Sequence, residues 1–426
     1  MSRPLPLEGI RVLDLGQFWA APSAGRAWAD AGADVIKIES QARPDPLRIQ
    51  ARGIYPDHQP GEDHWNRSGM INERNRNKRS LTLDLAHPRG HEIFMHLVKV
   101  SDVVSQNYSR RVMPSLGLDY ETLASVNPRI IMVSILSQGL EGPESDYVSY
   151  GQNLEQLGGI SYLSGYPDDQ NSSVGFALPD PLAGITAAFS LLAALRHREL
   201  TGRGLHIDFS QREAASLVVG DSLVEYSLTG KVPQRRGNHE PGAFPSGCYP
   251  CAGKDRWIAL SIRNDHEWAR FCRAMRRPAL IDDSRFATLI ARKRHSDELD
   301  SVISEWTAQY EHYALLALLQ DNGVNAGAAL NPRELFQDPH LRARGFWERI
   351  EDTSAGVQEY YGRGYRLSLA TVDTRMPTPT LGQHNREILG GLLEMGAEEI
   401  EALEQEGVIG TRPLLSESGG MAGSRR

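Results

Sequence analysis

The sequence predicts an α/β protein, with a Rossmann-like parallel sheet in a large domain and a smaller α+β domain after it. Three observations support this fold class. Short apolar runs alternate with helical patterns up to residue 135, as is typical of strands joined by crossover helices. A polar linker, 230–238, separates them from a second set of strand and helix signals. The 426 residues, 40% of them hydrophobic, are also enough for two packed cores.

The chain begins with a βαβ pattern. Residues 10–15 and 34–38 form apolar runs, and 21–31 has the pattern of a helix that ends before Gly32. The turn after the first run, GQFWAAP, lacks the G-x-G-x-x-G pattern that lets a backbone approach a dinucleotide pyrophosphate. The sequence therefore argues against an NAD enzyme, and we expect Glu39, at the end of the second run, to contact solvent.

A polar region follows this βαβ unit. Residues 41–72 have no periodicity, which predicts a long loop over one face of the sheet. The basic and amide cluster 75–80 then leads into a strand expected at 81–85. Such a cluster either binds phosphate or forms a solvated edge, and the sequence by itself favours the solvated edge.

Two further strands, 102–105 and 130–135, alternate with helical patterns at 87–100 and 119–126. Ligands of parallel sheets bind at the loops beyond the carboxyl ends of the strands. In this chain those loops hold Phe18-Trp19-Ala20, Asn107-Tyr108 and Gln138-Gly139.

A long helix is expected from the Asp180-Pro181 pair onward, because Leu182, Ile185 and Phe189 recur at helical spacing. Asp is a favoured N-cap and Pro a favoured first helical residue, so spacing alone favours a capping role for Asp180. A carboxylate at the entrance to an apolar helix is also a candidate nucleophile.

Four segments divide the chain. Residues 1–229 form the large domain, which closes with a helix at 210–229, and 230–330 form the small α+β domain. Residues 331–412 form a C-terminal segment that returns to the large domain. The polar tail 413–426 is expected to be disordered.

Composition and charge argue against several classes of protein. The net charge of −8 argues against nucleic acid as a main partner. We find no apolar stretch long enough to span a bilayer and no signal-peptide core, so we expect a cytoplasmic protein with no membrane partner. Cys248 and Cys251 have the spacing of half a zinc or redox site, but no second pair follows, so no metal site is expected.

Several segments together resemble the class III coenzyme A-transferase family, which includes formyl-CoA transferase and carnitine CoA-transferases. The resemblance covers nearly the whole chain and rests on the order and spacing of the segments. They are LEGIRVLDLGQFWAAP, ADVIKIE, NKRSLTLDL, DVVSQNY, NPRIIMVSI, YGQNLEQLGGISYLSGYPD, GFALPDPLAGITAAFSLLAALRHRELTGRGLHIDF, RRGNHEPGAFPSGCYPC, GVNAGAALNPRELFQDPHLRARGFW and PTLGQHNREILGGLLEMGAEEIEALEQEGVI.

The resemblance implies that Asp180 is the nucleophile of an acyl-CoA:carboxylate CoA-transferase. Its carboxylate would attack the donor thioester to give an acyl-aspartyl anhydride, which the released thiolate would convert into an aspartyl-CoA thioester. The helix N-terminus is expected to keep the carboxylate ionised and to supply amide donors. The glycine-bearing loop 237–243 is expected to help stabilise the oxyanions, with Gly237, Asn238 and Gly242 as its candidate residues.

Coenzyme A or an acyl-CoA is thus expected as a substrate, with no permanently bound cofactor. The resemblance places Phe18, Trp19 and Ala20 at the pantetheine and thioester end. It places four backbone contacts near the adenine, at Leu83, Asp84, Leu85 and Ala86, and a polar and aromatic pair beside the cofactor, at Asn107 and Tyr108. Ser40 and Ser115 replace basic residues that some relatives use for the nucleotide, and the arginines available instead are Arg43, Arg48, Arg110 and Arg111.

Two alternatives stay open. A neighbouring branch of the fold racemises 2-methylacyl-CoA thioesters with a His and the equivalent Asp, but Gln152 stands where racemases typically carry the His, and an amide cannot exchange the proton. The other alternative is a catalytically silent CoA-binding protein.

The family fold is a homodimer of interlocked rings, and the candidate linkers near 230 and 330 are compatible with it. The size of the side chains at Trp19, Tyr150 and the loop near Gly242 suggests a larger acyl group, in preference to formate or oxalate.

Overall fold

The computed structural model describes residues 5–49, 54–170, 173–352 and 354–414. The chain forms two compact units. The first comprises 1–160, 173–221 and 342–426, and the second comprises 161–172 and 222–341. The domain boundaries drawn from the sequence stay a prediction, and the tail expected to be disordered lies, from residue 415 onward, outside the described residues.

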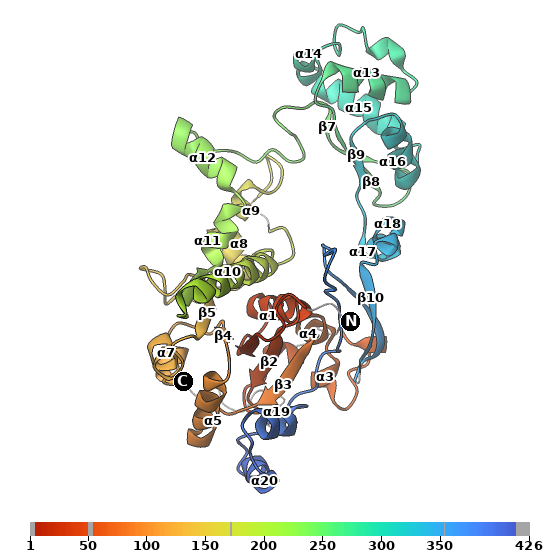
Figure 1. Ribbon diagram of the computed structural model, residues 1–426. Helices are drawn as coiled ribbons and strands as arrows, with labels where there is room; N and C mark the ends of the chain where they lie inside the picture. The colour runs from red at the N-terminus through yellow and green to blue at the C-terminus, as the bar shows by residue number, and fades with distance from the viewer. Residues whose placement is uncertain (1–4, 50–53, 171–172, 353, 415–426) are drawn as a thin grey trace. The chain divides into compact units, whose positions relative to one another are not determined.

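The first unit is built on a parallel sheet of six strands in the order β3-β2-β1-β4-β5-β6 (Figure 1). The strands are β1 (Arg11–Asp14), β2 (Asp34–Glu39), β3 (Lys78–Thr82), β4 (Val103–Gln106), β5 (Ile131–Leu136) and β6 (His206–Ser210). This sheet confirms the predicted α/β class. The strand order reverses between β1 and β4, and ligands of such sheets bind at the carboxyl ends of strands beside this reversal.

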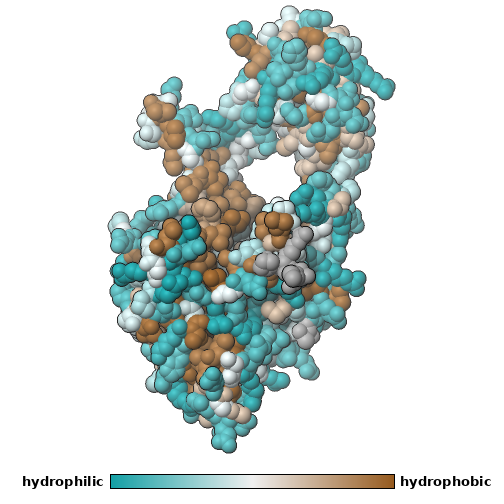
Figure 2. Space-filling model, viewed as in Figure 1, coloured by the Kyte–Doolittle hydropathy of each residue, from teal (hydrophilic) through white to brown (hydrophobic). Residues whose placement is uncertain are grey.

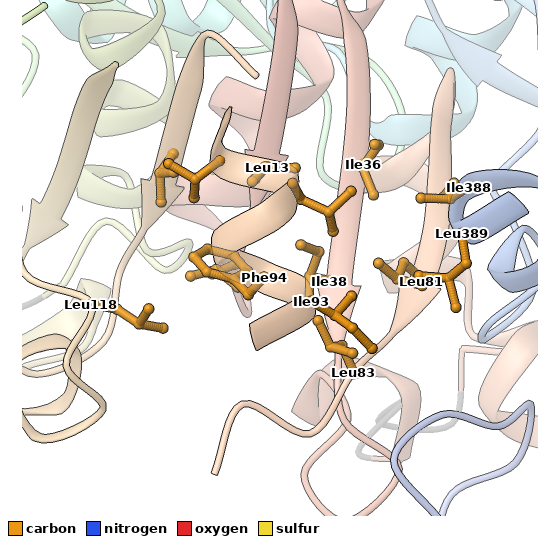
Figure 3. Close-up of a cluster of buried hydrophobic side chains, with 14 of the residues drawn as sticks. Leu13, Ile36, Ile38, Leu81, Leu83, Ile93, Phe94, Leu118, Ile388 and Leu389 are labelled. Carbon is orange, nitrogen blue, oxygen red and sulfur yellow. The ribbon is translucent and has the colours of Figure 1, made fainter. Parts of the chain in front are cut away.

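Helices cover both faces of the sheet. The helices of this unit are α1 (Ala20–Asp30), α2 (Pro46–Ile49), α3 (His64–Arg67), α4 (Gly69–Asn75), α5 (Pro88–Lys99), α6 (Val112–Ser115), α7 (Tyr120–Val126), α8 (Gly151–Leu157), α10 (Pro179–Thr201), α11 (Gln211–Leu217), α19 (Asn385–Leu392) and α20 (Ala397–Gln405). Alternate side chains of a strand face opposite sides, so Leu13 packs with α5 and α19, whereas Val12 packs with α1 and α10. Figure 3 shows the first of these clusters, with Phe94 and Leu389 against the sheet.

The polar segment 41–72 is not the long loop that its composition predicts. Helices α2 and α3 and the start of α4 lie within it, because its charged side chains find buried partners in the first unit; Asp45 and Arg48 are fully buried. Strand β3 begins at Lys78, earlier than predicted. The helix expected at 210–229 is two helices, α11 and α12 (Gly220–Thr229).

The second unit contains an antiparallel sheet of β7 (Ser246–Pro250), β8 (Trp257–Ser261) and β9 (Ala326–Ala328). Its core contains aromatic side chains of α13 (Asp265–Ala274) and α15 (Ser296–Thr307). Cys251 and Cys272 lie in this core as free thiols, and Cys248 is exposed. Among the described residues, no cluster of side chains is arranged to hold a metal ion, and no helix is long and apolar enough to cross a membrane.

Candidate active site

The turn between β1 and α1 is held from several sides. Asn107, which follows β4, accepts a hydrogen bond from the backbone N–H of Gln17 and donates one to its carbonyl, both at 2.8 Å. Lys37 Nζ donates to the carbonyl of Gly16 at 2.8 Å. Phe18 adopts a φ of 61°, a left-handed conformation that a bulky residue keeps only where its surroundings impose it. The turn therefore presents Phe18 and Trp19 in a fixed geometry at the strand-order reversal.

Buried ion pairs lie beneath this turn. Lys78 Nζ is 2.7 Å from Asp14 Oδ2, and Lys37 Nζ is 3.0 Å from Asp45 Oδ2, with all four side chains inaccessible to solvent. Within the basic cluster 75–80, Lys78 is therefore neither solvated nor available to bind a phosphate. The cause is the register of β3, which points Lys78 under α1.

Glu39 is also buried, which corrects the expectation that it contacts solvent. Arg48 forms a bidentate pair with it, with Nε 2.8 Å from Oε1 and Nη2 2.9 Å from Oε2. Burial raises the pKa of Glu39, but Arg48 and Lys37 outweigh burial and lower the pKa to about 2. Arg48 is therefore a structural cation and is not available for a CoA phosphate.

Asp180 is the second residue of α10, and the expectation that it caps this helix is wrong. Leu178 occupies the N-cap position. Pro179 and Pro181 have no N–H, the amide of Asp180 donates to the carbonyl of Ala177, and the amide of Leu182 donates to that of Leu178. Because the helix begins before Asp180, the N–H of Leu182, which a capping carboxylate at residue 180 would accept from, is bonded within the helix instead.

The Asp180 carboxylate therefore receives no hydrogen bond from the part of the chain that the structure describes. Burial raises its pKa to about 6, and the positive charge of Arg74 opposes this rise. The sequence-based expectation was the opposite, that the helix N-terminus keeps the group ionised with amide donors. A carboxylate without such donors keeps its lone pairs free for attack on carbon.

Gly151, the first residue of α8, fits against this carboxylate. A Cβ atom at residue 151 would lie 2.2 Å from Asp180 Oδ2 and 2.4 Å from Ala177 Cβ, so only glycine leaves room. The preceding Tyr150 contacts Phe18 edge to face, with ring centroids 5.8 Å apart. No local pattern in the sequence indicates this role of Gly151, because the contact joins segments 29 positions apart.

Helix α10 packs closely on α1, which brings Asp180 toward the turn. A Cβ at Gly184, one helical turn after Asp180, would lie 2.8 Å from Ser23 Cβ and 3.1 Å from the Ala20 carbonyl oxygen. At the start of α1, the guanidinium of Arg74 lies over the Trp19 ring, 4.3 Å from its centroid. Phe18, Trp19, Tyr150 and Arg74 thus gather on the same side of the sheet as the candidate nucleophile.

Glu155 is a buried residue of this site that sequence reasoning missed. It accepts hydrogen bonds from the Ser173 hydroxyl and from the backbone N–H groups of Val174 and Leu178, the latter two at 3.2 Å. The segment that leads into α10 is therefore fixed by a carboxylate of α8. Glu155 lies four positions after Gly151, but nothing in the sequence marks it, because its burial and its partners are seen only in the fold.

Comparison with known proteins identifies the family. Residues 7–385 match the family model for CoA-transferase family III. The chain belongs to this family. It is 35% identical to succinyl-CoA--D-citramalate CoA-transferase of Chloroflexus aurantiacus, over 95% of this chain and 98% of the relative. It is 34% identical to succinate--glutarate CoA-transferase of Agrobacterium fabrum, over 92% and 96%.

The fold agrees with a solved member of the wider group. A CAIB/BAIF family protein from Brucella suis superposes with a TM-score of 0.83 at 30% identity, and the match covers 91% of this chain and 99% of that one. The resemblance noted in the sequence is confirmed, and the chain is a class III CoA-transferase. CoA thioesters are the substrates of such enzymes.

The other candidate CoA contacts of this CoA-transferase lie beyond strand ends. Leu83, Asp84, Leu85 and Ala86 follow β3, and the amide of Ala86 donates to Asp84 Oδ1 at 3.0 Å. The backbone N–H of Tyr108, beyond β4, donates to Gln106 Oε1. Both polar atoms of the Asn107 side chain form hydrogen bonds with the backbone of Gln17. Their contacts with CoA stay predictions.

The candidate arginines of the CoA-transferase differ in availability. Arg43 is exposed and forms no ion pair with the described residues. Arg111 pairs with Asp146 at 2.7 Å, and Arg110 reaches the same carboxylate at 3.5 Å. Of these candidates, Arg43 is therefore the one whose guanidinium could bind a phosphate without first breaking an ion pair with a carboxylate.

The glycine-bearing loop belongs to the second unit. Gly237 has a φ of 57°, and its N–H donates to the carbonyl of Gly165 at 3.0 Å. Asn238 Nδ2 donates to the Tyr166 hydroxyl at 2.8 Å. A Cβ at Gly242 would meet no atom within 4 Å. The proposed role of this loop toward the nucleophile stays a prediction.

Proposed function

We propose that this CoA-transferase moves CoA between an acyl-CoA thioester and a free carboxylic acid, with Asp180 as covalent nucleophile. The observation that carries the proposal is the state of the Asp180 carboxylate, which is desolvated and receives no hydrogen bond from the described residues. With a pKa of about 6, roughly 90% of it is ionised at pH 7. Desolvation also makes a carboxylate more basic, and nucleophilicity rises with basicity.

The reaction needs no net proton transfer. An Asp180 oxygen attacks the thioester carbonyl carbon, the C–S bond breaks, and its electron pair leaves on the CoA thiolate, which gives a mixed anhydride. The thiolate then attacks the side-chain carbonyl carbon of residue 180, which releases the donor acid and leaves an aspartyl-CoA thioester. The acceptor carboxylate runs the two steps in reverse and regenerates free Asp180.

Each of these attacks places negative charge on a carbonyl oxygen. We assign its stabilisation to the loop that holds Gly237, Asn238 and Gly242, because glycine permits backbone N–H groups to approach a substrate closely. Phe18, Trp19 and Ala20 line the thioester end of the CoA site, and Arg43 and Arg111 are the candidate phosphate ligands.

The acids that react are proposed to be dicarboxylic. The relatives' names include D-citramalate, glutarate, L-malate and mesaconate as substrates, with succinyl-CoA or succinate as the other partner. A formyl-CoA:oxalate CoA-transferase of Streptomyces avermitilis is 31% identical, so preference for formate or oxalate is the competing outcome. The bulk of Trp19 beside the nucleophile favours the longer acids.

A homodimer is proposed as the working form, with interlocked rings as in the family fold. Helix α10 exposes Ile185 and Phe189, 70% and 71% accessible, and Leu217 at the end of α11 is 74% accessible. Figure 2 shows hydrophobic residues gathered over α10 and α11. A patch of this kind on a soluble enzyme is typical of a subunit interface. Phe189→Glu should weaken the dimer in sedimentation, whereas Leu369→Glu, a similar change at an exposed residue outside α10 and α11, should not.

The mechanism is tested by trapping the intermediate. The enzyme is incubated with succinyl-CoA, quenched with hydroxylamine or borohydride, and digested for mass spectrometry. We expect modification at Asp180, and no transfer by Asp180→Ala. Modification at another residue would contradict the mechanism. Exchange of an α-proton without transfer would identify a racemase, and the absence of both would identify a silent CoA-binding protein.

The location is proposed to be cytoplasmic. Cys248, Cys251 and Cys272 are free thiols, which suits a reducing compartment.

A further inference from the structure

Arg74, at the end of α4, is a buried arginine with hydrogen-bonding capacity left over. Its residue is 5% accessible. Its Nη1 donates to the Met70 carbonyl at 2.6 Å, but its Nε is buried without a hydrogen-bond partner among the described residues. Its Nη2 makes no hydrogen bond in those ranges either. An edge of the guanidinium fork, Nε and Nη2, therefore has no acceptor.

Neighbouring cations of the same segment are different. Arg76 pairs with Asp30 through Nε and Nη2, at 3.3 and 2.9 Å, and Lys78 pairs with Asp14 at 2.7 Å. Among the described residues, Arg74 forms an ion pair with Glu73 alone, whose Oε2 is 3.3 Å from Nη1. Glu73 also binds Arg26 and the Tyr361 hydroxyl through its other oxygen. Glu73 therefore neutralises the positive charge of Arg74 only in part, because the same carboxylate also binds Arg26 and Tyr361.

The position of Arg74 points to the reaction centre. Its guanidinium covers the Trp19 ring, 4.3 Å from the centroid, at the turn that faces α10. Its charge acts on the Asp180 carboxyl, lowering the pKa that burial raises. No hydrogen bond joins Arg74 to Asp180 in the described chain, so Nε and Nη2 of Arg74 remain available to a ligand.

We propose that Arg74 binds the second carboxylate of a dicarboxylic acyl group or acid, while the first carboxylate reacts at Asp180. A guanidinium edge made of Nε and one Nη matches the two oxygens of a carboxylate. A buried donor without an acceptor is unfavourable in the empty site, and a carboxylate supplies the missing acceptor. Trp19 holds the guanidinium plane from one side. This inference rests on the proposed function and specifies the class of acid.

The test compares three acids as CoA acceptors from succinyl-CoA: succinate carrying an isotopic label, butyrate, and succinamate, in which the second carboxylate is a neutral amide. We expect the native enzyme to prefer succinate over the other two by on the order of 100-fold in kcat/KM, because a site built for a polar group rejects analogues that leave it unpaired. Arg74→Gln should remove most of this preference. The loss should appear mainly in KM for succinate, with butyrate changed by no more than a few-fold.

Arg79→Gln is the matched control, because Arg79 lies five positions after Arg74 in the sequence but pairs with Asp34 at 2.6 Å. It should keep the preference for succinate. Arg74→Lys keeps the charge without the fork and should give an intermediate preference. If Arg74→Gln does not fold, Arg74→Lys is the variant that tests the role of Arg74, and an unchanged preference for succinate in it would contradict the inference.

Three results would overturn the inference. They are equal use of the three acids by the native enzyme, an equal loss for succinate and butyrate in Arg74→Gln, and an unchanged preference in that variant. Failure of the proposed function is distinguished by trapping. If native enzyme is labelled at Asp180 but does not discriminate between the acids, the covalent mechanism stands, whereas the preference for dicarboxylic acids and the role of Arg74 are wrong.

Discussion

Replacement of Asp180 by Asn separates a catalytic carboxylate from a helix cap. A capping aspartate stabilises its helix, and its removal costs about 1 kcal/mol. A carboxylate that is desolvated without donors destabilises the folded state instead, as long as it is ionised. Asp180→Asn keeps the shape and removes the charge. We therefore expect the variant to be inactive and more stable than the native enzyme.

The size of the effect follows from the pKa. Burial raises the pKa of Asp180 from 3.8 to about 6. Each unit corresponds to about 1.4 kcal/mol, so two units give about 3 kcal/mol as an upper value. The side chain is partly accessible to solvent, which reduces the expected gain to about 1–3 kcal/mol.

The pH dependence of folding stability shows whether the ionised Asp180 carboxylate stabilises or destabilises the folded state. Between pH 3.8 and 6 the folded protein binds the proton more tightly than the unfolded chain, so ionisation costs folding free energy. The penalty is fully present above pH 6, shrinks as the pH falls through that range, and disappears below it. The advantage of Asp180→Asn should therefore be largest at pH 7 to 8 and decline toward pH 4.

The assay is denaturant unfolding of both proteins at equal protomer concentration, repeated across this pH range. Asp119→Ala is the control, because Asp119 caps α7 by accepting from the N–H of Thr122 at 2.9 Å. Its pKa is lowered by that hydrogen bond, so this variant should lose stability at neutral pH. If Asp180→Asn is also less stable at pH 7.5, the carboxylate is a cap and the reasoning here fails.

Three further changes test the surroundings of the nucleophile. Gly151→Ala should lower kcat by on the order of 100-fold, because its Cβ displaces the reacting carboxylate. Gly220→Ala, whose Cβ meets nothing within 4 Å, should leave kcat unchanged, and steady-state assays of both variants test this. Glu155→Gln should slow covalent labelling at little cost in CoA binding, and equal slowing of both would point to a general folding defect. Lys78→Met should destabilise the fold by about 3–5 kcal/mol in denaturant unfolding, because it leaves Asp14 as an unpaired buried charge; unchanged stability would contradict this account of the buried pair.

Much of the fold follows from local patterns. The apolar runs at 10–15, 34–38 and 130–135 are strands, because a strand of a covered parallel sheet must be hydrophobic on both faces. The order of weak motifs was enough to recognise the family. The Asp180-Pro181 pair, by contrast, favours a capping role by its spacing, and only the structure shows that Leu178 occupies the N-cap position.

The state of the charged groups was decided by the tertiary structure. Lys78 looks solvated in its polar run, and Glu39 looks solvated at a strand end, but each meets an opposite charge that makes its burial tolerable. The space for Asp180 depends on Gly151, and the free edge of Arg74 depends on where Glu73 points. Periodicity reports which side chains avoid water. Which polar group meets which partner is a property of distances between remote segments, and only the folded chain contains those distances.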